Sequence, residues 1–566
     1  MTAWIESLMP HLMMAPILLP MAAAAVMLLT GETRRPLKHA LNLLACALNL
    51  LVAAALMLWV VRHGTQAVGV YLPGNWPVPY GIALVVDRLS AMMLLLTAVL
   101  ALAGVTYASG RWDRAGVHFH PLFQMQLMGL NGAFLTGDLF NLFVFFEIML
   151  TASYGLLLHG SGPARVKAGL HYIAVNLLAS TLFLIGVAIL YGVTGTLNMA
   201  DMALVVPSIS PQDRGLLHAG AAILAIAFLV KAGAWPLNFW LAPAYSAATA
   251  PVAALFAVMT KLGVYAVLRM WTLLFAPDAG VSAQFGGGAL IWAGLATLAA
   301  GGIGMMATHH LGRMVAAGVI MSSGTVLAAI GFGRPDITAG ALYYAFGSTL
   351  AVGALFLIVE LIDRSRQVEE TPVYVSEIEP AEGFAYPVDL LPPPDVNLDE
   401  DQRPLIGRAI PAAMAFLGLA FAACAITLAG LPPMSGFVGK IVMLTGLLGA
   451  AHADGQTGQV ATPIWVLMGL LIVTGLLTTI ALSRAGMRYF WAPGGRPAPR
   501  LRVIETAPIA ALLLLIGALV WQADAALRYA QATARALYQP GGYISRVVSA
   551  RPTPSPAADS REGARR

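Results

Sequence analysis

Apolar residues run in blocks of about twenty along almost the whole chain, and polar breaks separate the blocks. A block of this length spans the ~30 Å hydrocarbon layer of a bilayer as an α-helix. The pattern therefore predicts an all-α polytopic membrane protein with fourteen spans. Their expected ranges are 10–30, 39–61, 89–107, 121–137, 139–158, 168–193, 216–234, 250–275, 288–307, 312–333, 338–362, 409–430, 463–483 and 505–522. No basic segment precedes the first block, so we interpret it as a span and not as a cleavable signal.

Composition supports this interpretation and narrows the function. Of 566 residues, 59% are hydrophobic and 10% are charged, against roughly 25% charged in an average soluble domain. The chain has two cysteines, Cys46 and Cys424, where an iron–sulfur cluster normally takes four. C-x-x-C, haem-attachment and Gly-rich nucleotide motifs are absent from the sequence. We therefore expect no cofactor, no metal, no redox chemistry and no ATP hydrolysis.

The distribution of basic residues predicts the orientation. With the N-terminus outside, the inside loops hold seventeen Lys and Arg, so the positive-inside rule favours this arrangement. The outside loops hold five: Arg62, Arg88, Arg214, Arg269 and Arg334. Because these basic residues are scattered between the spans, membrane topology explains them better than binding to nucleic acid does. The expected location is the cell inner (cytoplasmic) membrane. An acidic, Pro-rich segment at 363–408 is then an extended inside loop, and the C-terminal tail, with seven arginines, lies outside.

Four ionisable residues lie within apolar blocks: Glu147, Lys231, Lys261 and Lys440. Charged side chains are costly and rare at mid-membrane. Any one of them is as consistent with helix packing as with transport. Together they predict a pathway for protons, because a proton needs a titratable or hydrated group at each step across the bilayer.

Two of these lysines adjoin a shared frame, A-G-x-x-P. "KAGAWPLNFW" contains Gly233 and Pro236, and "LAGLPPMSGFVGK" contains Gly430 and Pro433. Proline removes a hydrogen-bond donor, so each frame is expected to break its helix and to expose polar backbone to a wet cavity. The matched frames also indicate an internal repeat, as in many transporters.

Other polar residues near the spans are weaker candidates for the pathway. Asp138 lies at the junction of two spans and is expected to cap a helix. His309 and His310 lie at an inside boundary, where solvated or capping roles are more common than proton relay.

Four longer strings carry a family likeness. They are "LTGDLFNLFVFFEIMLTASYGLLLHG", "KAGAWPLNFWLAPAYSAATAPVAALFAVMTKLGVY", "GLPPMSGFVGKI" and "GNWPVPYGIALVVDRLSAMM". They resemble the D-type subunit of the multisubunit Mrp-type (Pha-type) cation/proton antiporter. The lysine string alone is shared with antiporter-like subunits of respiratory complex I and membrane hydrogenases. The resemblance implies fourteen helices, two inverted five-helix repeats and broken helices 7 and 12. It further implies that Glu147 in helix 5 pairs with Lys231 in helix 7, and that Lys261 and Lys440 continue the polar axis.

The same resemblance implies a division of the chain into four regions. Residues 1–120 would form helices 1–3, 121–275 the first repeat with helices 4–8, and 288–483 the second repeat with helices 9–13 and the insertion at 363–408. Residues 505–566 would form the last helix and a polar tail. One departure is Gly347, where relatives often carry a histidine. Water, Ser348 or a nearby histidine would then bridge the axis, or conduction through the second half would be altered.

The sequence thus predicts a proton-translocating subunit of a Na⁺ or K⁺/proton antiporter that performs no covalent chemistry. Its expected partners are subunits of the A, B, C, E, F and G types, the lipid bilayer, protons and the exchanged cation, without nucleic acid. The alternative is an antiporter-like, proton-pumping subunit of a complex I-type or membrane hydrogenase complex. A third possibility, a scaffold without transport, predicts that the buried charges are dispensable.

Overall fold

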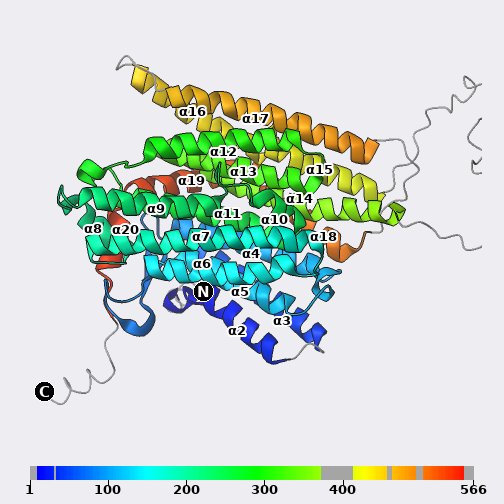
Figure 1. The fold of residues 1–566 in the computed structure, drawn as a ribbon, viewed down its shortest axis with the longest axis horizontal. Helices are drawn as coiled ribbons and strands as arrows, with labels where there is room; N and C mark the ends of the chain where they lie inside the picture. Colours follow the sequence, from blue (N-terminus) through cyan, green and yellow to red (C-terminus); the bar gives the residue numbers. More distant parts are fainter. Residues whose placement is uncertain (1–8, 31–33, 371–411, 456–461, 492–500, 553–566) are drawn as a thin grey trace, which may run out of the picture.

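The computed structural model describes residues 9–30, 34–370, 412–455, 462–491 and 501–552. Its helices run side by side along the longest axis of the molecule (Figure 1). Within these residues, thirteen helices are long and apolar enough to cross a membrane. The predicted all-α polytopic fold is therefore confirmed. The count of fourteen spans and the repeat boundaries stay predictions, and most of the expected insertion at 363–408 lies outside the described residues.

The helices are α2 Ala15–Leu29, α3 Arg35–Arg62, α4 Arg88–Ala108, α5 Phe119–Leu135, α6 Leu139–Leu158, α7 Pro163–Thr194, α8 Met199–Val205, α9 Arg214–Ala232, α10 Leu241–Ala247, α11 Ala250–Leu274, α12 Gly287–Ala307, α13 Leu311–Gly331, α14 Pro335–Glu370, α15 Ala412–Ala429, α16 Ser435–Gly455, α17 Thr462–Gly486, α18 Val503–Trp521, α19 Ala523–Tyr538 and α20 Gly541–Val548. Short 3₁₀ helices occur at Pro73–Asn75, Trp112–Arg114, Val206–Ser208 and Gly280–Ser282. A short π-helix occurs at Met487–Trp491. The strands β1, Gly69–Tyr71, and β2, Leu84–Val86, pair antiparallel, with Val70 opposite Val85.

Two helices end at a glycine in the left-handed conformation, at matching places in the repeated frame. Gly233 follows α9 with φ 69°, and Gly430 follows α15 with φ 75°. In each case the next residue's N–H donates to the carbonyl five residues earlier, as Ala234 does to Leu229 (2.9 Å) and Leu431 to Ile426 (3.0 Å). Only glycine adopts this backbone without strain, so the frame ends both helices in the same way.

Each of these helices continues beyond its break. The short helix α10 lies toward the opposite end of the molecule from α9, and α15 and α16 are arranged in the same manner (Figure 1). The sequence pattern did not include a span at 435–455, where the structure has α16. The start of this helix is hidden in the sequence by the glycines and prolines of the break, which interrupt the apolar run.

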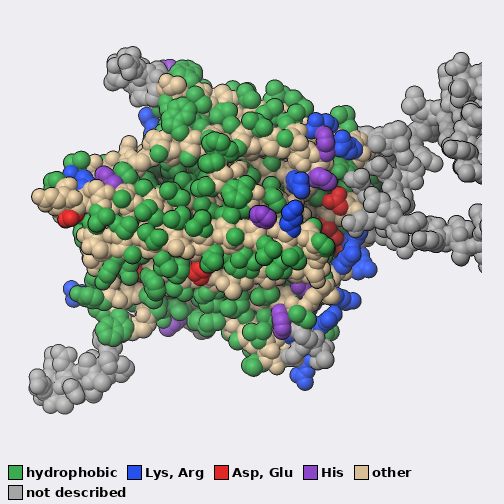
Figure 2. Space-filling model, viewed as in Figure 1, with side chains coloured by type: hydrophobic (Ala, Val, Ile, Leu, Met, Phe, Trp, Pro, Cys, Tyr) green, Lys and Arg blue, Asp and Glu red, His purple; other side chains and the backbone are tan. Residues whose placement is uncertain are grey.

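The two ends of the bundle differ in charge. Lys and Arg side chains gather at the right-hand end of the face in Figure 2, and hydrophobic side chains cover most of the band between the ends. We call this the basic end; α12 meets α17 there, where Arg484 donates to the Met306 carbonyl at 3.0 Å. Basic residues were expected to gather on one side of the membrane, and they gather at one end of the bundle. The orientation of the chain in a membrane stays a prediction.

The C-terminal segment is more structured than the polar tail that the sequence predicts. Helices α19 and α20 are amphipathic, and each buries one face, α19 mainly against α14 and α20 mainly against α8. Tyr529 on α19 donates a hydrogen bond to the Arg88 carbonyl at 2.6 Å. A search for continuous apolar blocks misses these two helices, because charged residues alternate with apolar ones along an amphipathic helix.

Candidate proton pathway

The four charged residues predicted for the pathway lie on four different helices: Glu147 on α6, Lys231 on α9, Lys261 on α11 and Lys440 on α16. The three lysines are buried, with 4, 4 and 6% of their surfaces exposed in that order. Glu147 is half-buried. Burial on this scale leaves each ammonium dependent on the few polar groups that surround it.

A serine joins the first two charges. The Ser180 hydroxyl on α7 donates to Glu147 Oε1, and Lys231 Nζ lies 3.4 Å from Ser180 Oγ. Lys231 Nζ also lies 5.1 Å from the centroid of the Phe146 ring, a favourable contact for a cation. Among the described side chains, no direct ion pair within 4 Å links Lys231 to Glu147. The structure therefore brings the expected pair together through a hydroxyl.

Ser180 was missed by sequence reasoning because a single serine within an apolar helix is unremarkable. A hydroxyl can donate one hydrogen bond while it accepts another. Placed between a carboxylate and an ammonium, it provides a relay that neither charged group offers alone.

Glu147 lies at the edge of the helix bundle and not in its centre. It follows Phe140 and Val144 on one face of α6, and both of these apolar side chains are exposed. Figure 2 shows acidic surface within the apolar band at the level of α6 and α7. A carboxylate in this position needs both Ser180 and a neighbouring cation to be tolerated within a bilayer.

Close backbone contact places Lys231 beside the helix that carries Lys261. A Cβ on Gly263 of α11 would lie 2.9 Å from the Lys231 carbonyl carbon, so the absence of a side chain lets α9 and α11 touch. Lys261 Nζ in turn lies 3.2 Å from Ser323 Oγ on α13. A small pocket of about 30 Å³ adjoins Lys261, and apolar side chains such as Met92 and Leu96 form most of its lining.

Hydroxyl groups continue from this point toward the second break. Ser322 Oγ on α13 lies 2.8 Å from Ser348 Oγ on α14. A Cβ on the adjacent Gly347 would lie 2.5 Å from Ser435 Oγ at the start of α16. Ser435 Oγ is buried and has no hydrogen-bond partner among the described residues. The Ser435 side chain therefore occupies the space beside Gly347.

Lys440 has a different kind of partner. Its Nζ donates to the Ala429 carbonyl at 2.8 Å, on the last residue of α15. A Cβ on Gly430 would lie 2.9 Å from the same Nζ, so the lysine stem crosses directly over the glycine that ends the helix. The ammonium thus satisfies a carbonyl that the broken helix leaves open.

The weaker candidates lie off this line. Asp138 caps α6, since its Oδ1 accepts from the Asn141 N–H at 2.8 Å, and burial raises the pKa of its carboxyl. His309 and His310 are exposed between α12 and α13. His310 lines a cleft of about 650 Å³ at the basic end, together with α10, Lys167 and Arg313.

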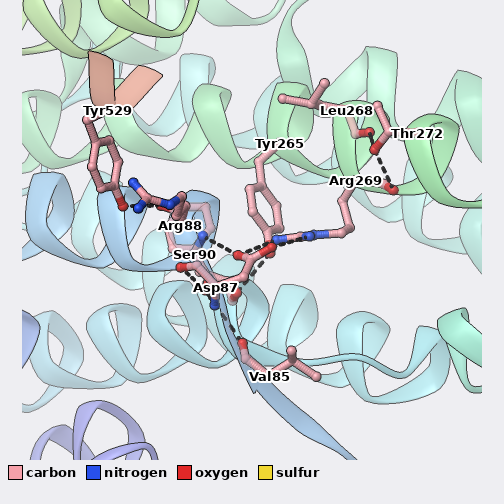
Figure 3. A network of polar contacts seen from close by, with 10 residues as sticks. Val85, Asp87, Arg88, Ser90, Tyr265, Leu268, Arg269, Thr272 and Tyr529 are labelled. Atoms are coloured by element: carbon pink, nitrogen blue, oxygen red, sulfur yellow. Dashed lines mark hydrogen bonds and ion pairs between the residues drawn. The ribbon is translucent and has the colours of Figure 1, made fainter. Parts of the chain in front are cut away.

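A buried ion pair at the opposite end was not expected from the sequence. The charge count assigned Arg269 to an outside loop, but it lies within α11 and is buried. Its two terminal nitrogens donate to the Asp87 carboxylate at 2.6 and 2.7 Å, as Figure 3 shows. Burial opposes the charge of Asp87, yet the Arg269 guanidinium outweighs it and holds the pKa of that carboxyl below its usual range. Lys261, Tyr265 and Arg269 follow one another at intervals of four residues. This spacing places the three polar side chains on one face of α11, and it is the sequence pattern that could have predicted a buried position for Arg269.

Comparisons with known proteins identify the family of the chain. Residues 136–379 match the family model described as NADH:quinone oxidoreductase/Mrp antiporter, transmembrane. The D-type subunit of a probable K⁺/H⁺ antiporter from Rhizobium meliloti is 49% identical over 97% of this chain and 99% of its own length. This chain belongs to the family of Mrp-type antiporter D-type subunits. A second relative of this type, from a Na⁺/H⁺ antiporter of Bacillus subtilis, is 31% identical over 95% of this chain and 100% of its own.

The fold of this Mrp-type antiporter subunit is also found in a solved structure. A chain of the Mrp complex from a Dietzia species superposes with a TM-score of 0.77 over 95% of this chain and 99% of its own. The identity is 24%, so this match supports the fold alone. The family resemblance noted in the sequence is confirmed by these matches, whereas the roles of the individual charged residues stay predictions.

Proposed function

We propose that this chain moves protons within a multisubunit antiporter that exchanges protons for Na⁺ or K⁺. Membership of the Mrp-type antiporter family supports this function. The observation that carries it is the contact of one hydroxyl, Ser180, with both Glu147 and Lys231 in the apolar part of the bundle. We propose Lys261 and Lys440 as the later steps, with Ser348 between them.

The relay at Ser180 requires no covalent intermediate. The Lys231 ammonium gives a proton to Ser180 Oγ while the Ser180 hydroxyl proton passes to Glu147. The products are a neutral amine and a neutral acid, so no net charge moves into the apolar region during this step. Return of the proton from Glu147 to another acceptor restores the carboxylate.

The remaining route needs water as well as side chains. Lys261 and Ser323 form one cluster. Ser322, Ser348 and the unpartnered hydroxyl of Ser435 lead to the α15–α16 break. Water in the polar gaps would connect these groups, since a buried water typically joins about three polar atoms.

We infer that the chain resides in the cell inner membrane with its N-terminus outside, and that subunits of the A, B, C, E, F and G types complete the exchanger. Relatives named for K⁺/H⁺ and Na⁺/H⁺ antiporters leave both cations as candidates. The chain alone is therefore expected not to restore salt tolerance to an antiporter-deficient host, whereas its complete operon should do so.

The second candidate is a proton-pumping subunit of a redox-driven complex, because the matching family model covers both groups. Purification of the tagged chain from its native membrane distinguishes them. Co-purification of small antiporter subunits supports exchange, and co-purification of quinone- or hydrogenase-type subunits supports the redox pump.

The decisive test removes titration from Glu147 and preserves its size. In everted vesicles, Glu147→Gln is expected to abolish the pH change induced by Na⁺ or K⁺, and Glu147→Asp to retain part of it. Asp213→Asn, at the exposed start of α9, is the matched control and should exchange normally. The amount of each complex subunit is checked on blots. Near-normal exchange by a well-assembled Glu147→Gln complex would leave Glu147 with a structural role only.

A further inference from the structure

A group of three metal-binding residue types lies at the basic end, away from the proposed pathway. His39 belongs to the first turns of α3, Asp113 to the turn Trp112–Arg114, and His120 to the start of α5. One donor atom from each residue lies within 4.8 Å of the other two. His39 precedes Asp113 and His120 by more than seventy residues, so no short sequence motif contains all three.

Two side-chain atoms of this group are buried and have no hydrogen-bond partner among the described residues. The Asp113 side chain is 10% exposed, and its Oδ1 has no hydrogen-bond partner among the described residues. Arg114 Nε is 4.0 Å from that oxygen, and the Arg114 side chain is largely exposed. His39 Nδ1 is likewise buried and has no hydrogen-bond partner within the described ranges. Buried polar atoms in native proteins nearly always have a protein, water or ion partner, so these two point to a ligand between them.

We propose that His39, Asp113 and His120 bind a divalent transition-metal ion, with Zn²⁺ as the best fit. Two imidazoles and one carboxylate form a donor set that suits Zn²⁺, which bonds to nitrogen and oxygen at about 2.0–2.2 Å. Ligand atoms around a tetrahedral ion with such bonds lie about 3.4 Å apart. His120 Nε2 and Asp113 Oδ2 are already 3.9 Å apart, so small side-chain rotations would complete the site.

A second layer of contacts orients the ligands. The Asn42 side-chain amide lies 2.8 Å from His120 Nδ1, and Gln124 Nε2 donates to Asn42 Oδ1 at 2.6 Å. The oxygen and nitrogen of an amide can exchange places by a flip. With both the Asn42 and the Gln124 amides flipped, Gln124 Oε1, which has no hydrogen-bond partner among the described residues, accepts from Asn42 Nδ2, and Asn42 Oδ1 accepts from His120 Nδ1–H. The lone pair of His120 Nε2 then faces the ion, as it does where outer partners hold metal-bound histidines. His159 Nε2, 2.9 Å from the Trp112 carbonyl, fixes the turn that carries Asp113.

Such an ion would join three separate elements. It would tie α3 to the α4–α5 connection and to α5, and it touches none of the groups proposed to move protons. The site therefore acts as a clamp at the basic end, and its effect is expected on metal affinity and thermal stability.

Metal titration of the purified full-length chain in detergent tests the proposal. After treatment with a chelator, isothermal titration with ZnCl₂ should show one saturable site per chain, and CoCl₂ should give the visible bands of a four-coordinate Co²⁺ ion. His39→Gln, Asp113→Asn and His120→Gln should each weaken binding by at least about tenfold, and Asn42→Ala by a smaller factor. His118→Gln, an exposed histidine two residues from His120, is the matched control and should bind normally.

Another variant separates lost ligation from lost folding. His39→Cys keeps a donor that Zn²⁺ and Co²⁺ accept, so it should retain binding and add a sulfur-to-cobalt absorption band. Absence of a saturable site in the unmodified chain would overturn the proposal. Equal binding by the unmodified chain and the three ligand variants would also overturn it, since the ion would then be adventitious.

Discussion

The two helix breaks share one backbone geometry, yet their lysines have different partners. Lys231 lies one residue before the end of α9 and contacts Ser180, which also bonds to Glu147. Lys440 lies after its break and donates to the Ala429 carbonyl at the end of α15. The frame thus fixes where each helix stops, and the position of the lysine relative to the break decides whether it meets a side chain or the helix end.

The charges of the two lysines are therefore balanced in different ways. In the first half a carboxylate is available to exchange a proton with the lysine through a hydroxyl. In the second half the negative end of the α15 dipole stabilises the Lys440 cation without being able to accept a proton. We therefore expect the first half to depend on a matched acid and base, and the second half to depend on one base and its hydration.

The largest expected difference concerns loss of the two lysines. Lys231→Ala leaves the half-buried Glu147 carboxylate in the apolar part of the bundle without its neighbouring cation, where an unbalanced charge is costly. We expect both poor assembly and no exchange. Lys440→Ala leaves one carbonyl without its partner, a penalty of about 1–3 kcal/mol, so assembly should persist with reduced exchange. Blots of membrane complexes and cation-induced pH changes in everted vesicles measure the two effects.

The double variants sharpen this comparison. Glu147→Gln with Lys231→Ala should restore assembly without restoring exchange, because it removes the unbalanced charge. Glu147→Gln with Lys440→Ala should show no such gain. A gain in assembly in both doubles would mean that the two halves are balanced by the same carboxylate and would refute the distinction.

A smaller effect is expected at the bridging hydroxyl. Ser180→Ala removes the relay but leaves both charges, so complexes should assemble while exchange falls by about tenfold, equivalent to ~1.4 kcal/mol. Ser180→Thr keeps a hydroxyl and should retain most activity. The neighbouring Thr181→Ala, whose exposed hydroxyl bonds only to the Leu177 carbonyl among the described residues, is the control. Unchanged initial rates in Ser180→Ala vesicles would exclude the hydroxyl from the pathway.

The smallest effect is expected at Gly347, where α14 passes close to Ser435 of α16. Gly347→Ala would place a Cβ 2.5 Å from Ser435 Oγ. Because this hydroxyl can rotate away, the loss of stability should lie at the lower limit of the about 1–3 kcal/mol that overpacking costs. Combination with Ser435→Gly should recover most of that stability. Gly192→Ala on α7, with open space around its Cα, serves as the control in thermal unfolding of the purified chain. A fully stable Gly347→Ala protein would show that α14 and α16 are loosely packed at this point.

Several features of the pathway could be predicted from single positions in the sequence. Glu147 and the three lysines stand out because a charge within an apolar block is rare. The two breaks stand out because Gly and Pro recur in the same frame. The partners do not stand out: Ser180, Ser323 and Ser348 are ordinary small residues of apolar helices, and only the packing of α7, α13 and α14 makes them neighbours of the charges.

The sequence by itself determined the membrane class, the helix breaks and the buried charges, since each depends on hydrophobicity, backbone preference or charge within a short stretch of chain. The tertiary structure decided which groups meet. Arg269 finds Asp87 across 182 residues, Lys231 reaches Glu147 through Ser180, and Lys440 turns back to Ala429. These contacts depend on the rotation and close approach of helices, which glycines such as Gly263 permit but which no local pattern specifies.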